Sequence, residues 1–212
     1  MKKFITFEGG EGSGKSTQTK LLSKSLNGIG EENIITREPG GTPFSEKIRN
    51  LIVNKNNYNL LVDTELLLVY ASRHEHVKNK IIPSLKSKNV ICDRYIHSSY
   101  CYQKESKNLN KKIDFIHKHF AENLMPDITF FLDLLPRDGI ERSLKVKRRE
   151  TKFEMKDLKF HENIRTTFLQ LSRTDKKILK IDASLSVKDV HMKIIDFLNS
   201  KSTFKKKLSY AL

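Results

Sequence analysis

The sequence has few cysteines and no long apolar segment, and both absences exclude classes of protein. Cys92 and Cys101 are the two cysteines among 212 residues. Neither has the paired spacing or the His partners of a disulfide framework or a zinc site. No segment approaches the roughly 20 apolar residues of a membrane span. The apolar stretch after Met1-Lys2-Lys3 is broken at Glu8, too early for a secretory signal. We therefore expect a soluble cytoplasmic protein without membrane association.

Acidic residues are outnumbered by basic ones, 25 to 40, which gives a formal net charge of +15. Such a balance is typical of nucleic-acid-binding proteins. However, the lysines are spread along the whole chain, and no aromatic-basic platform for stacking single strands is present. We interpret the charge as that of an enzyme with polyanionic small substrates, and we do not expect nucleic acid as a partner. A nucleic-acid-binding ATPase remains an alternative, supported by charge alone, and it would show steeply salt-dependent DNA binding.

A glycine-rich stretch near the start, "FEGGEGSGKST", matches the spacing G-x-x-x-x-G-K-[ST] of a nucleotide-binding phosphate loop. It follows a predicted buried strand over residues 3–7 and precedes a predicted helix from about Lys15 to Leu26, which is the context that the motif requires. Lys15 is expected to reach the β- and γ-phosphates, and the Ser16 hydroxyl to ligate Mg²⁺. The residues expected to bind ATP are Gly9, Gly10, Glu11, Gly12, Ser13, Gly14, Lys15, Ser16 and Thr17. A GTPase switch is not expected, because the chain lacks a guanine-reading N-K-x-D.

Short apolar strands alternate with helical patterns along the chain. Further strands are predicted over residues 33–36, 88–92, 127–132 and 178–181, and further helices over 45–53 and 63–85, the second bending or breaking near Pro83. This alternation predicts an α/β protein with a three-layer P-loop NTPase fold, a five-stranded parallel sheet flanked by helices. We expect one domain over residues 1–200, followed by a solvated or frayed basic tail over residues 201–212.

An aspartate stands at the end of the third predicted strand, in "VICDRY". The carboxyl ends of strands are where open α/β sheets place their ligands, so Asp93 is expected to orient Mg²⁺ or its water beside Ser16. An N-cap of the following helix is the alternative role for Asp93. The two roles are compatible.

Several motifs, in order, resemble those of bacterial thymidylate kinases. They are "FEGGEGSGKST", "TREPGGT", "EKIR", "ASRHEHV", "VICDRYIHSSYCYQ", "PDITFFLDLLP", "KFHENIR" and "KIDAS", and they extend from Phe4 to Ser184. The resemblance implies a kinase that uses ATP and Mg²⁺ to convert dTMP to dTDP, usually as a homodimer formed by helix packing. Another kinase of the same fold, such as a deoxynucleoside kinase, is the nearest alternative.

The resemblance also implies roles for residues around the acceptor phosphate. Arg49 and Arg94 would grip the dTMP phosphate, for which guanidinium groups have suitable geometry. Arg37 would shape the same pocket. Glu11, inside the loop, matches an acidic position near the sugar 3′-hydroxyl and the metal.

The acceptor base has its own predicted contacts. Arg73 would donate to the thymine O4, Ser98 and Ser99 would contact the base edge, and Tyr102 would line the sugar. The family usually has Phe stacked on thymine at the position of Val69, and this chain departs from that pattern. Either Val69 forms a weaker apolar wall, or Tyr70 compensates for the missing ring.

A strongly basic stretch, "ERSLKVKRRETKFE", follows the fourth strand and resembles the lid of the bacterial enzymes, at about residues 142–155. Because the phosphate loop contains no arginine, the positive charge needed in the transition state must come from this lid. On a helix, Arg142, Lys145 and Arg149 would share one face. Arg142 is expected to contact ATP, and Arg148 or Arg149 to carry most of the transition-state charge. Lys152 is a further candidate, at a position where the family more often has Arg. The predicted catalytic residues are Lys15, Arg94, Arg148 and Arg149.

Overall fold

The computed structural model describes residues 2–54, 60–102, 109–145, 152–153 and 155–211. Within these residues, five parallel strands form one sheet in the order β2-β3-β1-β4-β5. The strands are β1 (Phe4–Glu8), β2 (Asn33–Arg37), β3 (Asn89–Asp93), β4 (Ile128–Asp133) and β5 (Ile178–Asp182). All five predicted strands are present, and the predicted three-layer α/β architecture is confirmed.

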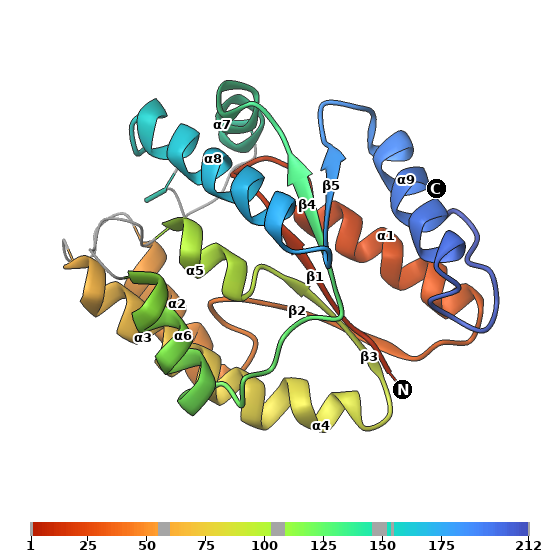
Figure 1. The fold of residues 1–212 in the computed structure, drawn as a ribbon, viewed down its shortest axis with the longest axis horizontal. Coiled ribbons are helices and arrows are strands. Elements are labelled where there is room, and N and C mark those ends of the chain that lie inside the picture. Colours follow the sequence, from red (N-terminus) through yellow and green to blue (C-terminus); the bar gives the residue numbers. More distant parts are fainter. Residues whose placement is uncertain (1, 55–59, 103–108, 146–151, 154, 212) are drawn as a thin grey trace.

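Helices cover both faces of the sheet (Figure 1). One face carries α1 (Lys15–Gly28) and α9 (Val187–Ser200), which contact each other. The other face carries α4 (Ile82–Leu85) against β3 and α8 (Leu158–Thr174) against β4 and β5, with α5 (Ile96–Tyr102) packed on α8. The other α-helices of the described residues are α2 (Pro43–Val53), α3 (Val62–His76), α6 (Leu109–Phe120) and α7 (Pro136–Leu144).

The central strand β1 determines where the functional residues meet. Its side chains are buried along its whole length, as expected for a strand covered on both faces. It pairs with β3 on one side, with Phe7 opposite Asp93, and with β4 on the other, with Glu8 opposite Phe131. The loop that leaves β1 therefore starts next to the carboxyl end of β3, at the edge of the sheet where open α/β folds bind ligands.

The long helix predicted over residues 63–85 is interrupted, as expected, but ahead of the proline. It consists of α3 (Val62–His76), a π-helical turn (Val77–Ile81) and α4 (Ile82–Leu85). Pro83 stands in the first turn of α4, where a backbone N–H has no intrahelical acceptor to bond. The π-helical turn ahead of Pro83 interrupts the helix, so that Pro83 falls in the first turn of the next helix, where proline is tolerated.

The first helix also ends later than the predicted end at Leu26. It continues through Gly28, and Gly30 adopts the left-handed conformation that terminates it, with a φ of 81°. Gly30 N–H bonds the Asn27 carbonyl and Glu31 N–H bonds the Leu26 carbonyl, the paired bonds that commonly close a helix C-terminus.

The basic tail is packed onto the domain, so the expectation of a frayed tail is wrong. Leu208 is 5% exposed and belongs to the core cluster that includes Leu26 and Leu198. The side chain of Asn199 bonds both the N–H and the carbonyl of Leu208, and Ser25 Oγ donates to the carbonyl of Ser209. Burial of one leucine contributes about 1.5–3 kcal/mol and adds to these hydrogen bonds, while the lysines of the segment remain in solvent. Among the described helices, none combines the length and apolarity needed to cross a membrane.

Candidate active site

The phosphate loop wraps around its own lysine. The Lys15 side chain is buried, and its ammonium donates to the carbonyls of Gly9 (3.1 Å) and Gly10 (2.7 Å). Burial, reinforced by repulsion from Arg94, lowers the pKa of Lys15 to about 8, although Glu11 and Asp93 oppose the shift. Because α1 begins at Lys15, the N–H groups and positive dipole end of a helix face the same space.

A cavity opens from this loop toward the end of β5. Most of the predicted ATP-binding residues line it: Glu11, Gly12, Ser13, Gly14, Lys15, Ser16, Thr17 and Arg142. We call it the phosphate-loop cavity. Gly9 and Gly10 lie beside it, since their carbonyls accept hydrogen bonds from Lys15.

Ser16 and Asp93 are brought together as predicted. Ser16 Oγ, in the first turn of α1, donates to Asp93 Oδ2 at the end of β3, at 2.5 Å. A hydroxyl and a carboxylate at the mouth of a phosphate-binding loop are oxygen ligands of the kind that Mg²⁺ prefers. Within the described residues, no group of three or more His, Cys, Asp or Glu side chains could hold a metal by itself. The Ser16 hydroxyl and the Asp93 carboxylate, as oxygen donors, fit Mg²⁺.

The helix after Asp93 is capped by a different acid. Glu8 Oε1 accepts hydrogen bonds from the N–H groups of Tyr95 (2.8 Å) and Ser98 (3.3 Å), and Glu8 Oε2 accepts from Ser98 Oγ (2.6 Å). These bonds satisfy N–H groups at the start of α5. Glu8 therefore has the helix-capping role that was the alternative for Asp93. Burial raises the pKa of Glu8 to about 7, against the opposing effects of Ser98 and Arg94. Glu8 thus anchors β1 to α5.

Arg94 stands between the two predicted substrates. Its guanidinium donates to Glu11 Oε1 (2.7 Å) and to the Gly9 carbonyl (2.9 Å), and lies 4.7 Å from the ring centre of Tyr102. Tyr102 Oη donates to the same oxygen of Glu11 at 2.9 Å. Burial alone would raise the pKa of Glu11, but the charges of Arg94 and Lys15 outweigh it and hold the pKa at about 2. Glu11 therefore stays ionised.

A second cavity, the acceptor cavity, begins where the phosphate-loop cavity ends. Every predicted substrate-binding residue except Arg37 lines it: Glu11, Arg49, Val69, Arg73, Arg94, Ser98, Ser99 and Tyr102. Glu11, Glu38, Arg49 and Arg94 line both cavities. Arg37 lines the phosphate-loop cavity and pairs with Glu46 at 2.9 Å. The two cavities thus meet at two acids and two arginines.

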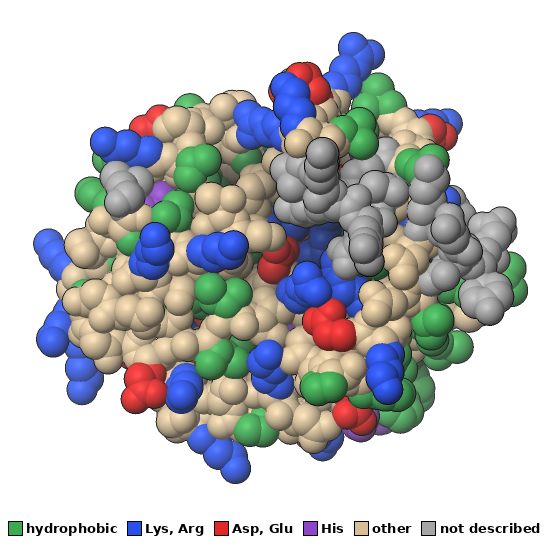
Figure 2. All heavy atoms as spheres, turned by 180° about the vertical axis from the view of Figure 1, so that it is seen from behind, with side chains coloured by type: hydrophobic (Ala, Val, Ile, Leu, Met, Phe, Trp, Pro, Cys, Tyr) green, Lys and Arg blue, Asp and Glu red, His purple; other side chains and the backbone are tan. Residues whose placement is uncertain are grey.

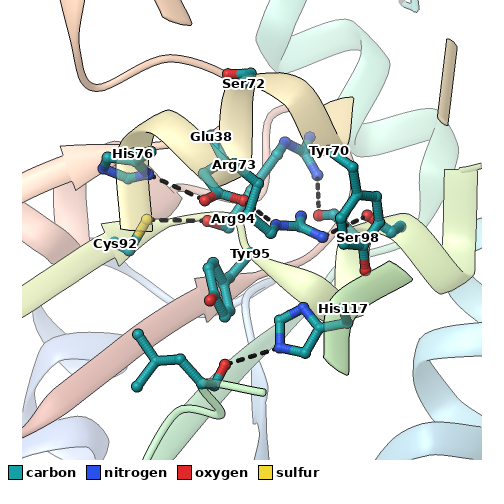
Figure 3. A network of polar contacts seen from close by, with 12 residues as sticks. Glu38, Tyr70, Ser72, Arg73, His76, Cys92, Arg94, Tyr95, Ser98 and His117 are labelled. Atoms are coloured by element: carbon teal, nitrogen blue, oxygen red, sulfur yellow. Dashed lines mark hydrogen bonds and ion pairs between the residues drawn. The ribbon is translucent and has the colours of Figure 1, made fainter. Parts of the chain in front are cut away.

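Arg73 is held in the acceptor cavity by a buried network (Figure 3). Its Nε donates to Glu38 Oε2 at 2.7 Å and one terminal nitrogen donates to Ser99 Oγ at 3.1 Å. The other oxygen of Glu38 is 3.0 Å from His76 Nδ1. Burial alone would lower the pKa of Arg73, but Glu38 and the rings of Tyr70 and Tyr95 hold it above its usual value. The arginine keeps its charge in a site where it is 1% exposed.

This network contains the functional residues that sequence reasoning missed. Glu38 and His76 lie in the quoted motifs "TREPGGT" and "ASRHEHV" but received no role. The spacing of Arg73 and His76, three residues apart on a helix, was the available signal that they share a face. The partner loop that carries Glu38 to that face could not be inferred from spacing.

The departure at Val69 is resolved in favour of the apolar wall. Val69 lines the acceptor cavity, whereas Tyr70 is 3% exposed and packs in the core beside His117 and Tyr95. The Tyr70 hydroxyl lies 3.5 Å from the Ile113 carbonyl, so Tyr70 does not supply a ring to the cavity.

The predicted lid is described only in part. Helix α7 ends at Leu144, and the main transition-state candidates, Arg148 and Arg149, lie outside the described residues, as does a helical face that would include Arg149. Arg142 donates to the Ala183 carbonyl at 3.0 Å and lines the phosphate-loop cavity. Lys152 lines the acceptor cavity, where it pairs with Glu65 at 2.6 Å.

Basic side chains do not gather into one stripe on the face seen in Figure 2. Lys and Arg are scattered around this face, and basic and acidic side chains lie together in a hollow near its centre. A continuous phosphate-tracking groove is not visible there, in contrast to what a nucleic-acid channel requires.

Comparison with known proteins agrees with this geometry. Residues 7–194 match the family described as Thymidylate kinase. A thymidylate kinase of Rickettsia canadensis (strain McKiel) is 44% identical over 195 residues, which cover 89% of this chain and 93% of that protein. One of Orientia tsutsugamushi (strain Ikeda) is 38% identical over 209 residues, 94% of each. The crystal structure of thymidylate kinase from Ehrlichia chaffeensis superposes with a TM-score of 0.74 at 32% identity and covers 93% of this chain and 98% of that one. The chain belongs to the thymidylate kinase family.

Proposed function

We propose that the two cavities each bind one substrate of the reaction of this family. In that reaction the γ-phosphate of ATP is transferred to dTMP to give dTDP and ADP. The observation that carries the proposal is that four residues line both cavities, namely Glu11, Glu38, Arg49 and Arg94. ATP would occupy the phosphate-loop cavity and dTMP the acceptor cavity. The transferred phosphoryl group would then lie between them, next to two guanidinium groups. We take residues 1–200 as the single domain that performs this reaction in the cytoplasm.

The donor side is assembled around the loop. Lys15 and the N–H groups at the start of α1 would hold the β- and γ-phosphates, and Arg142 would lie near the base or sugar of ATP, beside residues 184–187. A bound polyphosphate would favour the charged form of Lys15, whose pKa of about 8 is already above neutrality. Arg148 and Arg149 remain proposed transition-state donors from the sequence resemblance.

Mg²⁺ would be held by Ser16 and Asp93 together with phosphate oxygens. When bound, the metal neutralises charge on the transferred phosphates. Asp93 contributes a carboxylate that the paired strand β1 keeps beside the loop, and Ser16 contributes a hydroxyl already directed at it.

The acceptor side would recognise dTMP at three points. Arg49 and Arg94 would bind the phosphate, with Arg49 oriented by its bond to the Pro39 carbonyl at 2.9 Å and Arg37 shaping the pocket from the loop side. Arg73 would donate to the thymine O4, a site where cytosine carries a donor of its own. Tyr102 and Glu11 would face the sugar, and Ser98 and Ser99 would support the two arginines that they contact.

A homodimer is the proposed assembly. Support comes from α3 and α6, which contact each other and expose large apolar side chains: Leu67 is 60% exposed, Phe115 62% and Phe120 52%. Pairing of these helices with a second copy would remove that apolar area from water. Light scattering on wild type and on Leu67→Asp tests this. A monomeric wild type would refute it.

The catalytic proposal is tested by ADP release from Mg-ATP in a coupled assay with dTMP, dUMP, dCMP, AMP and thymidine as separate acceptors. Strong turnover with dTMP and weaker turnover with dUMP is expected. Turnover with thymidine but not dTMP would instead mean a deoxynucleoside kinase. ATP hydrolysis stimulated by DNA, with no acceptor turnover, would favour the nucleic-acid-binding ATPase.

A further inference from the structure

One wall of the acceptor cavity comes from an unexpected part of the chain. Lys152 and Phe153 line the cavity together with Val69 and Arg73 of α3. Lys152 bonds a residue of α3 that is 87 positions away in sequence. The wall therefore depends on a long-range contact rather than on the local fold of α3.

The ring of Phe153 lies between two sides of the cavity. It packs against the apolar cluster that includes Ile52 of α2 and Val69 of α3. It also meets the ring of Tyr102 on α5 edge-on, with centroids 5.4 Å apart and planes at 86°. Phe153 thus places an aromatic surface beside Val69, which has no ring of its own.

The neighbouring residue holds this ring in place. Lys152 Nζ and Glu65 Oε2 are 2.6 Å apart, and the side chains are 21% and 13% exposed. Glu65, Val69 and Arg73 follow one another at intervals of four residues, so they lie along one face of α3. An ion pair this sheltered is screened less by salt than a surface pair. It fixes the backbone at Lys152, and with it the position of Phe153.

We infer that Phe153 supplies the aromatic contact to the base of the acceptor, and that the Lys152–Glu65 ion pair positions it. The inference rests on the proposed placement of the pyrimidine nucleotide in the acceptor cavity. A flat base gains from offset or edge contacts with a phenyl ring beyond the burial of area. Phe153 is then a specificity-determining residue for a planar base, and Lys152 is a positioning residue.

Calorimetric titration of the full chain with dTMP, without ATP, tests the contact. Phe153→Leu keeps an apolar side chain and removes the ring, and is expected to weaken dTMP binding about fivefold. Lys152→Ala should weaken it to a similar extent, and the double variant should be no weaker than Phe153→Leu alone, because both changes remove the same contact. Exchanging the charges, with Glu65→Lys and Lys152→Glu in one chain, should restore most of the affinity. The KM for ATP should change less than twofold in Phe153→Leu.

The lack of tryptophan in the sequence gives a second, independent measurement. In Phe153→Trp the single indole should change its fluorescence when dTMP is added. Phe204→Trp, at a partly buried position packed against the opposite core cluster, should not respond. A purely structural role for Phe153 would lower thermal stability without this response.

The inference is overturned if Phe153→Leu binds dTMP like the wild type, if the Phe153→Trp signal does not respond to dTMP, or if ATP affinity falls instead. Additive losses in the double variant would overturn the positioning role of Lys152. If the wild type itself does not bind dTMP, the proposed function fails, which is a distinct result.

Discussion

The guanidinium of Arg94 donates a 2.7 Å hydrogen bond to the carboxylate of Glu11, and Arg94 does so from a left-handed backbone conformation with a φ of 68°. A non-glycine residue there costs on the order of 1 kcal/mol, and it persists because Glu11, Gly9 and the ring of Tyr102 fix the side chain. Strain of this kind concentrates at functional sites. It directs the arginine to the junction of the two cavities.

Replacing Arg94 by Lys should therefore remove most of the activity and leave the fold intact. Lysine keeps a charge near Glu11 and loses the planar fork that could bind Glu11 and a phosphate together. We expect kcat/KM for dTMP to fall by about 100-fold or more, as for loss of a directed transition-state donor. Steady-state kinetics with a parallel melting curve measures both effects. A variant within threefold of wild type would show that Arg94 only neutralises Glu11.

Glu38, which lines the acceptor cavity, should matter for the acceptor through its pairing with Arg73. Glu38→Gln removes the negative charge between Arg73 and His76, which leaves the guanidinium less firmly oriented. We expect the KM for dTMP to rise about tenfold and stability to fall by about 3 kcal/mol, the usual loss when a buried pair is broken. Glu141→Gln is the matched control, because that acid forms an exposed pair with Lys145. Equal effects on the KM for ATP and for dTMP would argue against a role specific to Arg73.

The Mg²⁺ requirement of the reaction should depend on Ser16 and Asp93. Chelation by EDTA should abolish turnover, and Asp93→Asn should raise the free Mg²⁺ needed for half-maximal rate about tenfold, because an amide is a weaker ligand than a carboxylate. The rate is measured against free Mg²⁺ at saturating ATP and dTMP. An unchanged Mg²⁺ requirement in Asp93→Asn would assign the carboxylate to organising the loop instead.

The sequence predicted the sheet and the phosphate loop because these depend on local signals, whereas the residues expected in the acceptor cavity came from the resemblance to a family and make up half of its lining. Alternating strands and helices, loop glycines and short motifs are each readable within a few residues. Glu8 shows the limit, because its hydrogen-bond partners Tyr95 and Ser98 lie 87 and 90 residues away in the sequence. The prediction of a frayed tail was wrong for a related reason. Leu208 is buried because α1 and α9 meet in the fold and form the surface on which it packs.

The same buried Glu8 gives a pH dependence of stability with a defined sign. Its pKa is raised by burial from 4.5 to about 7, so the folded state binds more protons than the unfolded state between these values. Stability from this group is complete below about pH 4.5 and is lost as pH rises through 7. Relative to Glu8→Gln, which does not titrate, wild type should lose up to ~1.4 kcal/mol per pH unit in this window. Urea unfolding of both proteins at pH 5, 6, 7 and 8 measures the difference. If the free energies of unfolding of wild type and Glu8→Gln change with pH in parallel, the pKa of Glu8 is not raised.

The contact between Gly12 and Gly139 links the phosphate loop to α7. A Cβ on Gly139 would lie 2.3 Å from the Glu11 carbonyl oxygen, and one on Gly12 would lie 2.0 Å from the Gly139 carbonyl oxygen. The loop and the helix therefore pack backbone against backbone. Arg142, three residues after Gly139, faces the phosphate-loop cavity from the same helix.

Gly139→Ala distinguishes the effect of this contact from that of helix propensity, because the two change the free energy of unfolding in opposite directions. Propensity alone predicts that alanine within α7 stabilises the protein by about 0.5–1 kcal/mol. The steric contact predicts a loss of about 1–3 kcal/mol, because neither backbone can yield without moving α7. Since α7 carries Arg142, the KM for ATP should rise more than the KM for dTMP. Gly28→Ala is the matched control, with no atom closer than 3.9 Å to its Cβ, and it should be neutral or stabilising. If both variants gain stability and keep the KM for ATP, α7 does not position the loop.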